Sequence, residues 1–287
     1  MTAIDVAGLR RHIGTRITDE DVASEAPLRA IAAAFDRDET PPGEGEAIPE
    51  GWHIGYFLAT VPTAALGPDG TPSGSGVLPK LPLPRRMYAG TRLAFHAPLR
   101  VGDRLRREIE LTDVRAREGS TGTLILTTQR RRIFTPRGLA ITEEYDTVFR
   151  EAVKPGARSS TPGGEQAPAG LPWRRAITPG PVNLFRFSAL TGNAHRIHYD
   201  RPYAVEVEGY PGLVVHGPFT QACLTDFIRD HNPRRPIRAF RMRARAPLFD
   251  TAPFDLMGRS IEGGAACEVW AIAPGGTIAI EASAELG

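Results

Sequence analysis

The spacing of apolar residues predicts a helix near the start of the chain. Residues 17–36 begin with the polar sequence ITDEDVAS, and apolar side chains then recur at intervals of three and four positions, on one helix face. Ser24 can cap this helix, and Pro27 lies in its first turn. The apolar face consists of Leu28, Ile31, Ala32 and Phe35.

Strand patterns occupy residues 91–150. Apolar residues there alternate with charged residues or form β-rich runs between turn residues. The predicted strands are Leu93–His96, Leu105–Leu111, Thr123–Phe134 and Leu139–Phe149. We therefore expect an antiparallel sheet that follows a helix, with a long Pro- and Gly-rich loop at residues 62–90 before the sheet.

The same order of elements returns in the second half of the chain. A helix is predicted from Pro218 to Arg229, and Pro233 marks its end. Four β-rich stretches follow near residues 238–246, 253–260, 265–273 and 277–285. In the first of them, one face of the strand carries Arg241, Arg243 and Arg245.

A Pro-, Gly- and Ser-rich segment at residues 154–170 is the best candidate for a linker between domains. It divides the chain into a first domain, residues 1–153, and a second domain, residues 171–287. Each half has a helix followed by strands, and the sequence Ala-Pro-Leu occurs where each set of strands begins, within residues 95–103 and 245–253. This repetition predicts a duplicated domain.

Composition narrows the class of protein. The 287 residues include 35 Lys and Arg against 33 Asp and Glu, and this net charge of +2 does not favour nucleic-acid binding. The chain has neither a run of about 18 apolar residues nor the apolar core of a signal peptide, so we expect a soluble cytoplasmic protein without a membrane partner. Cys223 and Cys267 lie in apolar stretches and are expected to be buried free thiols.

Three of the seven histidines lie within residues 187–219, which end where the second predicted helix begins. They are His195, His198 and His216. Histidine has the side-chain pKa nearest neutrality, so this stretch is suited to acid–base chemistry. The start of the helix offers unpaired N–H groups and the positive end of the helix dipole. A base beside such a site is suited to chemistry next to a carbonyl group.

Motifs in both halves resemble one group of enzymes. LTGNAHRIHYD and YPGLVVHGP resemble the hydratase motif of the MaoC-like, R-specific enoyl-thioester hydratases. GYFLATVPTAALGPDG, LPLPRRMYAG, FHAPLRVGD and GLAITEEYDTVFRE resemble the first half of the mesaconyl-C4-CoA hydratase-like and type 2 hydroxyacyl-thioester dehydratase proteins. The resemblance covers about residues 10–287 and implies an α+β double hot-dog fold. In that fold two curved antiparallel sheets each wrap around a central helix, and only the second half would carry an active site.

The resemblance implies catalytic roles for three residues. His198 would be the general base or acid, and the backbone N–H of Gly217 would hold the thioester oxygen. The wider family has Asp five residues before the histidine, where this chain has Asn193. Either Asn193 orients water or the thioester, or it only shapes the turn after Gly192. We expect Asn193 and His198 to point into one pocket beside Gly217, with residues 52–90 closing its far side.

The remaining residues of the stretch have structural alternatives. His195 and Asp200 either orient His198 or structure the loop, and a further alternative is that His195 is a second base. His216 is expected to anchor the turn before the helix, and both His195 and His216 are expected to contribute to substrate binding. The spacing of His195 and His198 falls on a loop without a third ligand at a familiar distance, so no metal site is predicted.

Substrate contacts are expected from tyrosines and arginines. Tyr199, Tyr210 and Pro211 are expected to shape the acyl pocket. Arg85, Arg86 and the arginines at 241, 243 and 245 can bind the phosphates of a CoA carrier, although the strand arginines also fit a solvated face.

We predict a hydro-lyase that reversibly adds water across an α,β-unsaturated acyl-CoA. No cofactor other than the CoA thioester substrate is expected, because hydrogen bonds alone would stabilise the enolate-like state. The resemblance suggests a mesaconyl- or itaconyl-type thioester first, and a 3-hydroxyacyl group on acyl carrier protein second. An acyl-CoA thioesterase and a non-catalytic module that binds acyl thioesters stay open as alternatives, as does assembly into a homo-oligomer.

Overall fold

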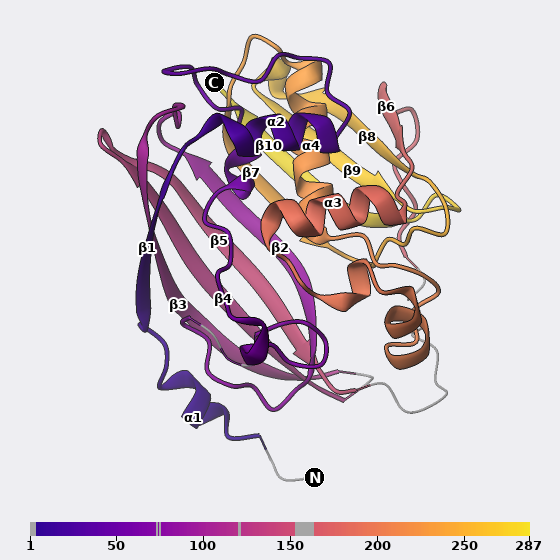
Figure 1. Ribbon diagram of the computed structural model, residues 1–287. Coiled ribbons are helices and arrows are strands. Elements are labelled where there is room, and N and C mark those ends of the chain that lie inside the picture. The colour runs from indigo at the N-terminus through magenta and orange to yellow at the C-terminus, as the bar shows by residue number, and fades with distance from the viewer. Residues whose placement is uncertain (1–3, 73, 75, 120–121, 153–163) are drawn as a thin grey trace.

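Two sets of antiparallel strands join edge to edge into one curved sheet (Figure 1). The computed structural model describes residues 4–72, 74, 76–119, 122–152 and 164–287. The first set, in sheet order, is β1 (Arg16–Val22), β3 (Arg104–Gly119), β4 (Gly122–Thr135), β5 (Gly138–Arg150) and β2 (Arg85–Phe95). The second set continues with β7 (Ile237–Ala244), β10 (Ile278–Leu286), β9 (Ala266–Ile272), β8 (Phe254–Ile261) and β6 (Trp173–Ile177).

The two sets meet where β2 pairs with β7. The pairing runs from Gly90 opposite Arg243 to Ala94 opposite Ala239. A Cβ atom on Gly90 would lie 2.4 Å from the Met242 carbonyl oxygen, so only glycine permits this approach of the two backbones. The junction therefore depends on a residue that no side-chain pattern marks.

Three main helices lie on the same side of the sheet (Figure 1). They are α2 (Glu25–Ala34), α3 (Pro181–Thr191) and α4 (Gly217–His231). The buried α4 contacts β2, β7 and β9, so it packs against strands of both halves. The ring of Phe35, just after α2, packs against those of Phe187 in α3 and Phe219 in α4. One hydrophobic core thus contains residues of both halves.

Shorter helical segments connect these elements. They are α1 (Val6–Arg10), η1 (Trp52–Gly55), η2 (Thr63–Ala65), η3 (Arg196–His198), η4 (Tyr203–Val207) and η5 (Glu262–Gly264). Among the described residues, no helix is long and apolar enough to cross a membrane. Cys223 and Cys267 are buried free thiols, which confirms the prediction.

The first predicted helix begins directly after Ser24, as expected, although the Ser24 side chain makes no capping hydrogen bond. The polar stretch before it is the unpredicted strand β1. The end of the predicted loop at residues 62–90 is also strand, because β2 begins at Arg85. In the second half, the predicted helix and the four strands after it agree with α4, β7, β8, β9 and β10 to within two residues at each end.

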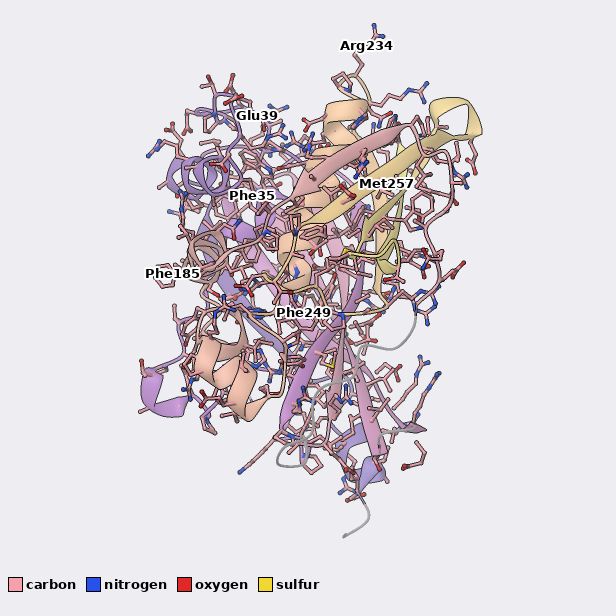
Figure 2. All side chains as sticks on the ribbon, turned by 90° about the vertical axis from the view of Figure 1, so that its right-hand side faces the viewer. Phe35, Glu39, Phe185, Arg234, Phe249 and Met257 are labelled. Atoms are coloured by element: carbon pink, nitrogen blue, oxygen red, sulfur yellow. The ribbon has the colours of Figure 1, made fainter. Side chains whose placement is uncertain are left out.

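Two further elements, β6 and α3, were not predicted. In α3, Leu184 and Phe187 are buried whereas Phe185 is 59% exposed and projects from the surface (Figure 2). Because an aromatic residue lies on the exposed side, the apolar residues of α3 do not mark a single face, and their spacing did not predict the helix. Of the predicted linker at residues 154–170, residues 154–163 lie outside the part of the chain that the structure describes, and residues 164–170 lie within it. The division into residues 1–153 and 171–287 stays a prediction.

Candidate active site

The turn after α3 fixes the orientation of Asn193. Gly192 ends the helix in the left-handed conformation, with φ of 62°, and the Asn193 N–H donates to the Ser188 carbonyl at 2.8 Å. The side-chain oxygen of Asn193 accepts a hydrogen bond of 3.1 Å from the His195 N–H. Asn193 therefore shapes the turn through its oxygen, and its amide NH₂ group has no partner among the described residues.

His198 lies at the end of η3 with its imidazole buried. Its Nδ1 is 2.7 Å from the Val214 carbonyl oxygen, which can only accept, so Nδ1 carries the proton and Nε2 has the lone pair. Burial, reinforced by nearby His195, lowers the pKa of His198 to about 3, although the bond to Val214 raises it. His198 is thus a neutral base at pH 7.

His216 holds the His198 ring from one face. The two rings stack with centroids 3.6 Å apart and planes inclined by 20°. His216 Nε2 shares a hydrogen bond of 2.8 Å with the hydroxyl of Ser188 in α3. Burial lowers the pKa of His216 well below its ordinary range, and the neighbouring His198 and His195 add to the effect. His216 therefore couples α3 to the start of α4, consistent with its expected role as an anchor.

His195 meets His198 edge-on, with ring centroids 5.5 Å apart. Its Nε2 lies 3.9 Å from an oxygen of Asp69. Burial lowers the pKa of His195 to about 4, and the positive charges of Arg86 and Arg85 contribute to the lowering. Three neutral imidazoles thus lie together in this site.

Gly217 is the first residue of α4, and Pro218 occupies the next position of the helix. Within the part of the chain that the structure describes, the Gly217 N–H has no hydrogen-bond partner. The ring of Tyr88 covers the α-carbon, since a Cβ atom on Gly217 would lie 2.1 Å from Tyr88 Cδ1. The unpaired N–H at the positive end of the helix can stabilise an oxyanion.

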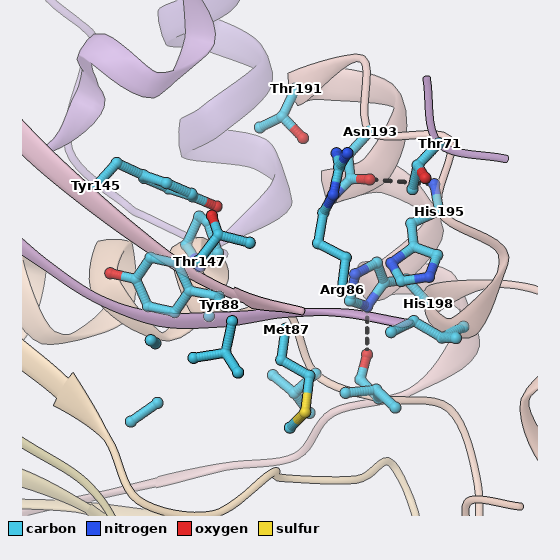
Figure 3. Close-up of a pocket in the computed structure, with 18 of the residues that line it drawn as sticks. Thr71, Arg86, Met87, Tyr88, Tyr145, Thr147, Thr191, Asn193, His195 and His198 are labelled. Atoms are coloured by element: carbon cyan, nitrogen blue, oxygen red, sulfur yellow. Dashed lines mark hydrogen bonds between the residues drawn. The ribbon is translucent and has the colours of Figure 1, made fainter. Parts of the chain in front are cut away.

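These groups line a cavity of about 700 Å³ (Figure 3). Asn193, His195, His198 and Gly217 reach it from the second half, as expected. The first half supplies much of the remaining lining, and several of its lining residues, between positions 59 and 89, belong to the predicted 52–90 region, which therefore contributes to the pocket. The volume suits a small molecule or the acyl end of a larger one.

The family model for hydroxyacyl-thioester dehydratase type 2 matches residues 51–250. The chain belongs to this family. It is 43% identical over 280 residues, 96% of each chain, to a protein of Chloroflexus aurantiacus named mesaconyl-C(4)-CoA hydratase. It is 24% identical over 274 residues, 84% of this chain and 89% of the other, to a mitochondrial hydroxyacyl-thioester dehydratase type 2 of Schizosaccharomyces pombe. Family membership confirms the prediction of a hydratase or dehydratase, a hydro-lyase.

Solved structures confirm the predicted α+β double hot-dog fold. A structure titled MaoC-like dehydratase has a TM-score of 0.68 at 17% identity, covering 97% of this chain and 99% of that one. A Mycobacterium tuberculosis protein, whose title describes a double hotdog fold, has a TM-score of 0.58 at 14% identity and covers 96% of each chain.

The predicted substrate-binding residues of this family member separate into two groups. Tyr210 and Arg86 line the cavity together with His195. Tyr199 and Pro211 are not among the described residues that line it; Tyr199 is 40% exposed and donates its hydroxyl to the Ala194 carbonyl at 3.0 Å. Their roles stay predictions.

The predicted arginines also differ in their surroundings. Arg85 is buried, forms an ion pair with Glu208 and lies over the Tyr210 ring. Arg245 lines the cavity although its side chain is exposed, and it pairs with Glu281, which is not among the described lining residues. Arg241 and Arg243 are also exposed and are not among the described lining residues. Asp200 pairs with Arg196 at 2.7 Å, which favours the loop-structuring alternative for that carboxylate.

Sequence reasoning missed several cavity residues. Tyr88 donates to Gln221 at 3.2 Å and meets the Tyr145 ring edge-on, and the guanidinium of Arg131 lies over the Tyr145 ring, 4.1 Å from its centroid. Ser188, the partner of His216, lies on the unpredicted helix α3. Sheet pairing brings Tyr88, Tyr145 and Arg131 to the site from β2, β5 and β4. Tyr88 and Tyr145 lie in motifs that carry the resemblance, but no role was predicted for them.

Proposed function

We propose that this chain hydrates an α,β-unsaturated acyl-CoA of the mesaconyl type, and catalyses the reverse dehydration. The observation that carries the proposal is the sharing of one cavity by two complementary groups. His198 presents a neutral Nε2 that has no partner among the described residues, and Gly217 presents an unpaired N–H at a helix start. A base and an oxyanion donor are what addition of water beside a thioester requires.

The proposed reaction begins at the β-carbon of the thioester. The Nε2 atom of His198 accepts a proton from water as the water oxygen bonds to the β-carbon. The π electrons move to the thioester oxygen, where the Gly217 N–H stabilises the resulting enolate. The imidazolium then returns its proton to the α-carbon, and the carbonyl re-forms. One water is consumed, and His198 ends neutral, as it began.

Asn193 fits the role of water holder in this scheme. Its oxygen is engaged by the His195 N–H, so the amide NH₂ group is the part left to donate to the water oxygen. The stacked His216 keeps the His198 ring in place during both proton transfers. The proposed chemistry uses side chains and backbone of this chain alone.

The names of the relatives support the two directions of this reaction. The relative at 43% identity is named a hydratase of a CoA thioester, and the relative at 24% identity is named a dehydratase of hydroxyacyl thioesters. Hydration and dehydration are one equilibrium, so a single site serves both.

The test is a panel of enoyl-CoA substrates followed by loss of absorbance of the conjugated double bond. We expect turnover of a mesaconyl-type CoA without release of free thiol. Thiol release measured with a thiol reagent would identify a thioesterase instead. Binding of CoA esters without either signal would identify a non-catalytic module.

A further inference from the structure

The cavity carries positive charge that its own lining does not balance. Three arginines line it, and none of its described lining residues is Asp or Glu. Arg131 is paired outside the lining with Glu143 at 3.1 Å, and Arg245 with Glu281 at 2.7 Å. Arg86 has no ion-pair partner within the described residues.

The guanidinium group of Arg86 makes few hydrogen bonds with the described residues. Its Nε is buried without a partner, and its Nη2 reaches only the Pro72 carbonyl, at 3.4 Å. The guanidinium lies over the Phe149 ring, 5.3 Å from the centroid. Against the lowering by burial, the carboxylate of Asp69, which accepts hydrogen bonds from Thr71, is near enough for its charge to raise the pKa of Arg86 but forms no ion pair with it among the described residues. Burying such a group without an anion is costly, which points to an anionic ligand.

The position of Arg86 identifies which anion that is. Arg86 extends from β2 towards Asn193 and His195 (Figure 3). Burial is the main cause of the lowered pKa of His195, and the positive charge of Arg86 is the next largest cause. It therefore lies at the reacting end of the cavity. The phosphates of CoA are separated from the thioester by the whole pantetheine arm. An anion near the reacting carbons must belong to the acyl group itself.

We infer that Arg86 binds a second, free carboxylate on the acyl group and makes this site selective for dicarboxylyl thioesters. The inference rests on the proposed function and assigns a specificity residue to it. A planar guanidinium can hold a carboxylate through two parallel hydrogen bonds. The neutral Asn193 amide and the neutral imidazoles around it add no negative charge that would repel this carboxylate.

The test compares fumaryl-CoA with crotonyl-CoA, which differ only in a carboxylate or a methyl group at the same carbon. The parent enzyme should favour fumaryl-CoA. Arg86→Gln should lower kcat/KM for fumaryl-CoA by roughly 10- to 100-fold, the loss expected for a charge-assisted hydrogen bond, and leave crotonyl-CoA turnover near the parent value. If Arg86→Gln does not fold, Arg86→Met retains the apolar stem over Phe149 and is measured instead.

The matched control is Arg92→Gln on the same strand. Arg92 pairs with Glu144 and Asp146 away from the cavity, so this variant should change neither substrate's rate. An equal loss for both substrates in the Arg86 variant would overturn the inference, since both carry CoA. Parent turnover of crotonyl-CoA without any preference for fumaryl-CoA would also overturn it. Absence of turnover of any enoyl-CoA would instead defeat the proposed function.

Discussion

At the scale of single residues, the site depends on keeping imidazoles uncharged inside the protein. His198 donates its Nδ1 proton to the Val214 carbonyl and is stacked on His216, so neither its tautomer nor its orientation is free to change. Burial opposes protonation of both rings. In the proposed reaction, the imidazolium that forms when His198 takes a proton from water is therefore short-lived, which favours prompt transfer of that proton to the α-carbon.

The roles of His198 and Asn193 can be separated by two substitutions. His198→Ala should lower kcat by roughly 10² to 10⁴, the usual effect of removing a general base. Asn193→Asp should lower kcat by less than His198→Ala does: a carboxylate oxygen can still accept the His195 N–H, but the variant loses the amide donor proposed to hold the water and adds a negative charge to the site. Initial rates of enoyl-CoA hydration measure both variants. An inactive Asn193→Asp beside an active His198→Ala would invert the assignment and make His195 the leading base.

The buried histidines also predict how stability depends on pH. Folding lowers the pKa of His195 from its ordinary 6.5 to about 4. The contribution of this residue to the free energy of unfolding is therefore complete above pH 6.5 and is lost as the pH falls towards 4. The unfolded chain takes up a proton there that the folded chain excludes. The free energy of unfolding should fall by up to about 1.4 kcal/mol per pH unit for each such histidine. Denaturant unfolding between pH 7 and pH 5 measures this slope.

The control for that slope is His195→Gln, which removes one titrating group and retains polarity. The free energy of unfolding of this variant should depend less steeply on pH, because about one fewer proton is taken up when the chain unfolds. Equal slopes in variant and parent would mean that folded His195 protonates as readily as it does in the unfolded chain.

At the scale of elements, the contact between β2 and α4 sets the shape of the site. Tyr88 of β2 covers Gly217 and donates to Gln221 one turn further along α4. This contact leaves room for a hydrogen atom and nothing larger on Gly217. The strand of one half therefore decides how closely a substrate oxygen can approach the helix start of the other.

Gly217→Ala should destabilise the protein by about 1–3 kcal/mol, because the added methyl group overlaps the Tyr88 ring. Tyr88→Ala removes that overlap at the cost of a cavity. In the double variant the two effects should be clearly less than additive, since the clash exists only when both side chains are present. Denaturant unfolding of the four proteins measures the coupling. Strict additivity would mean that the ring does not press on Gly217.

The elements that could be predicted from the sequence are those with a clear apolar face. α4 and the strands after it have such faces, and Pro218 and Pro233 mark the limits of the helix. β1 was missed because it is an edge strand with mostly exposed side chains, so no apolar alternation reveals it. Its pairing with β3, far along the chain, is what makes it a strand.

The residues of the site also divide into those that could be predicted from the sequence and those that could not. Asn193, His198 and Gly217 belong to one contiguous stretch, and a local motif was enough to bring them together in advance. Tyr88 and Tyr145 reach the cavity because β2 and β5 are neighbours in the sheet, which is a property of the fold and not of any short sequence.

At the scale of the whole molecule, the two halves share one core and one sheet. Expression of residues 171–287 alone would expose the edge of β7 that β2 covers and the face of α4 that Tyr88 and Phe35 cover. We expect this fragment to aggregate, and to become more soluble when residues 1–153 are produced with it. Size-exclusion chromatography measures both. A monomeric fragment with a cooperative unfolding transition would show that the second half folds alone.

The junction between β2 and β7 has a consequence for how this enzyme can change. The groups assigned to proton transfer and oxyanion binding all come from the second half of the gene, whereas Arg86, Tyr88 and Tyr145 come from the first. Mutation or recombination confined to the first half can therefore alter which thioester is accepted without touching the catalytic loop. The first half thereby supplies a region in which new substrate preferences can be selected while the proposed catalytic groups stay unchanged.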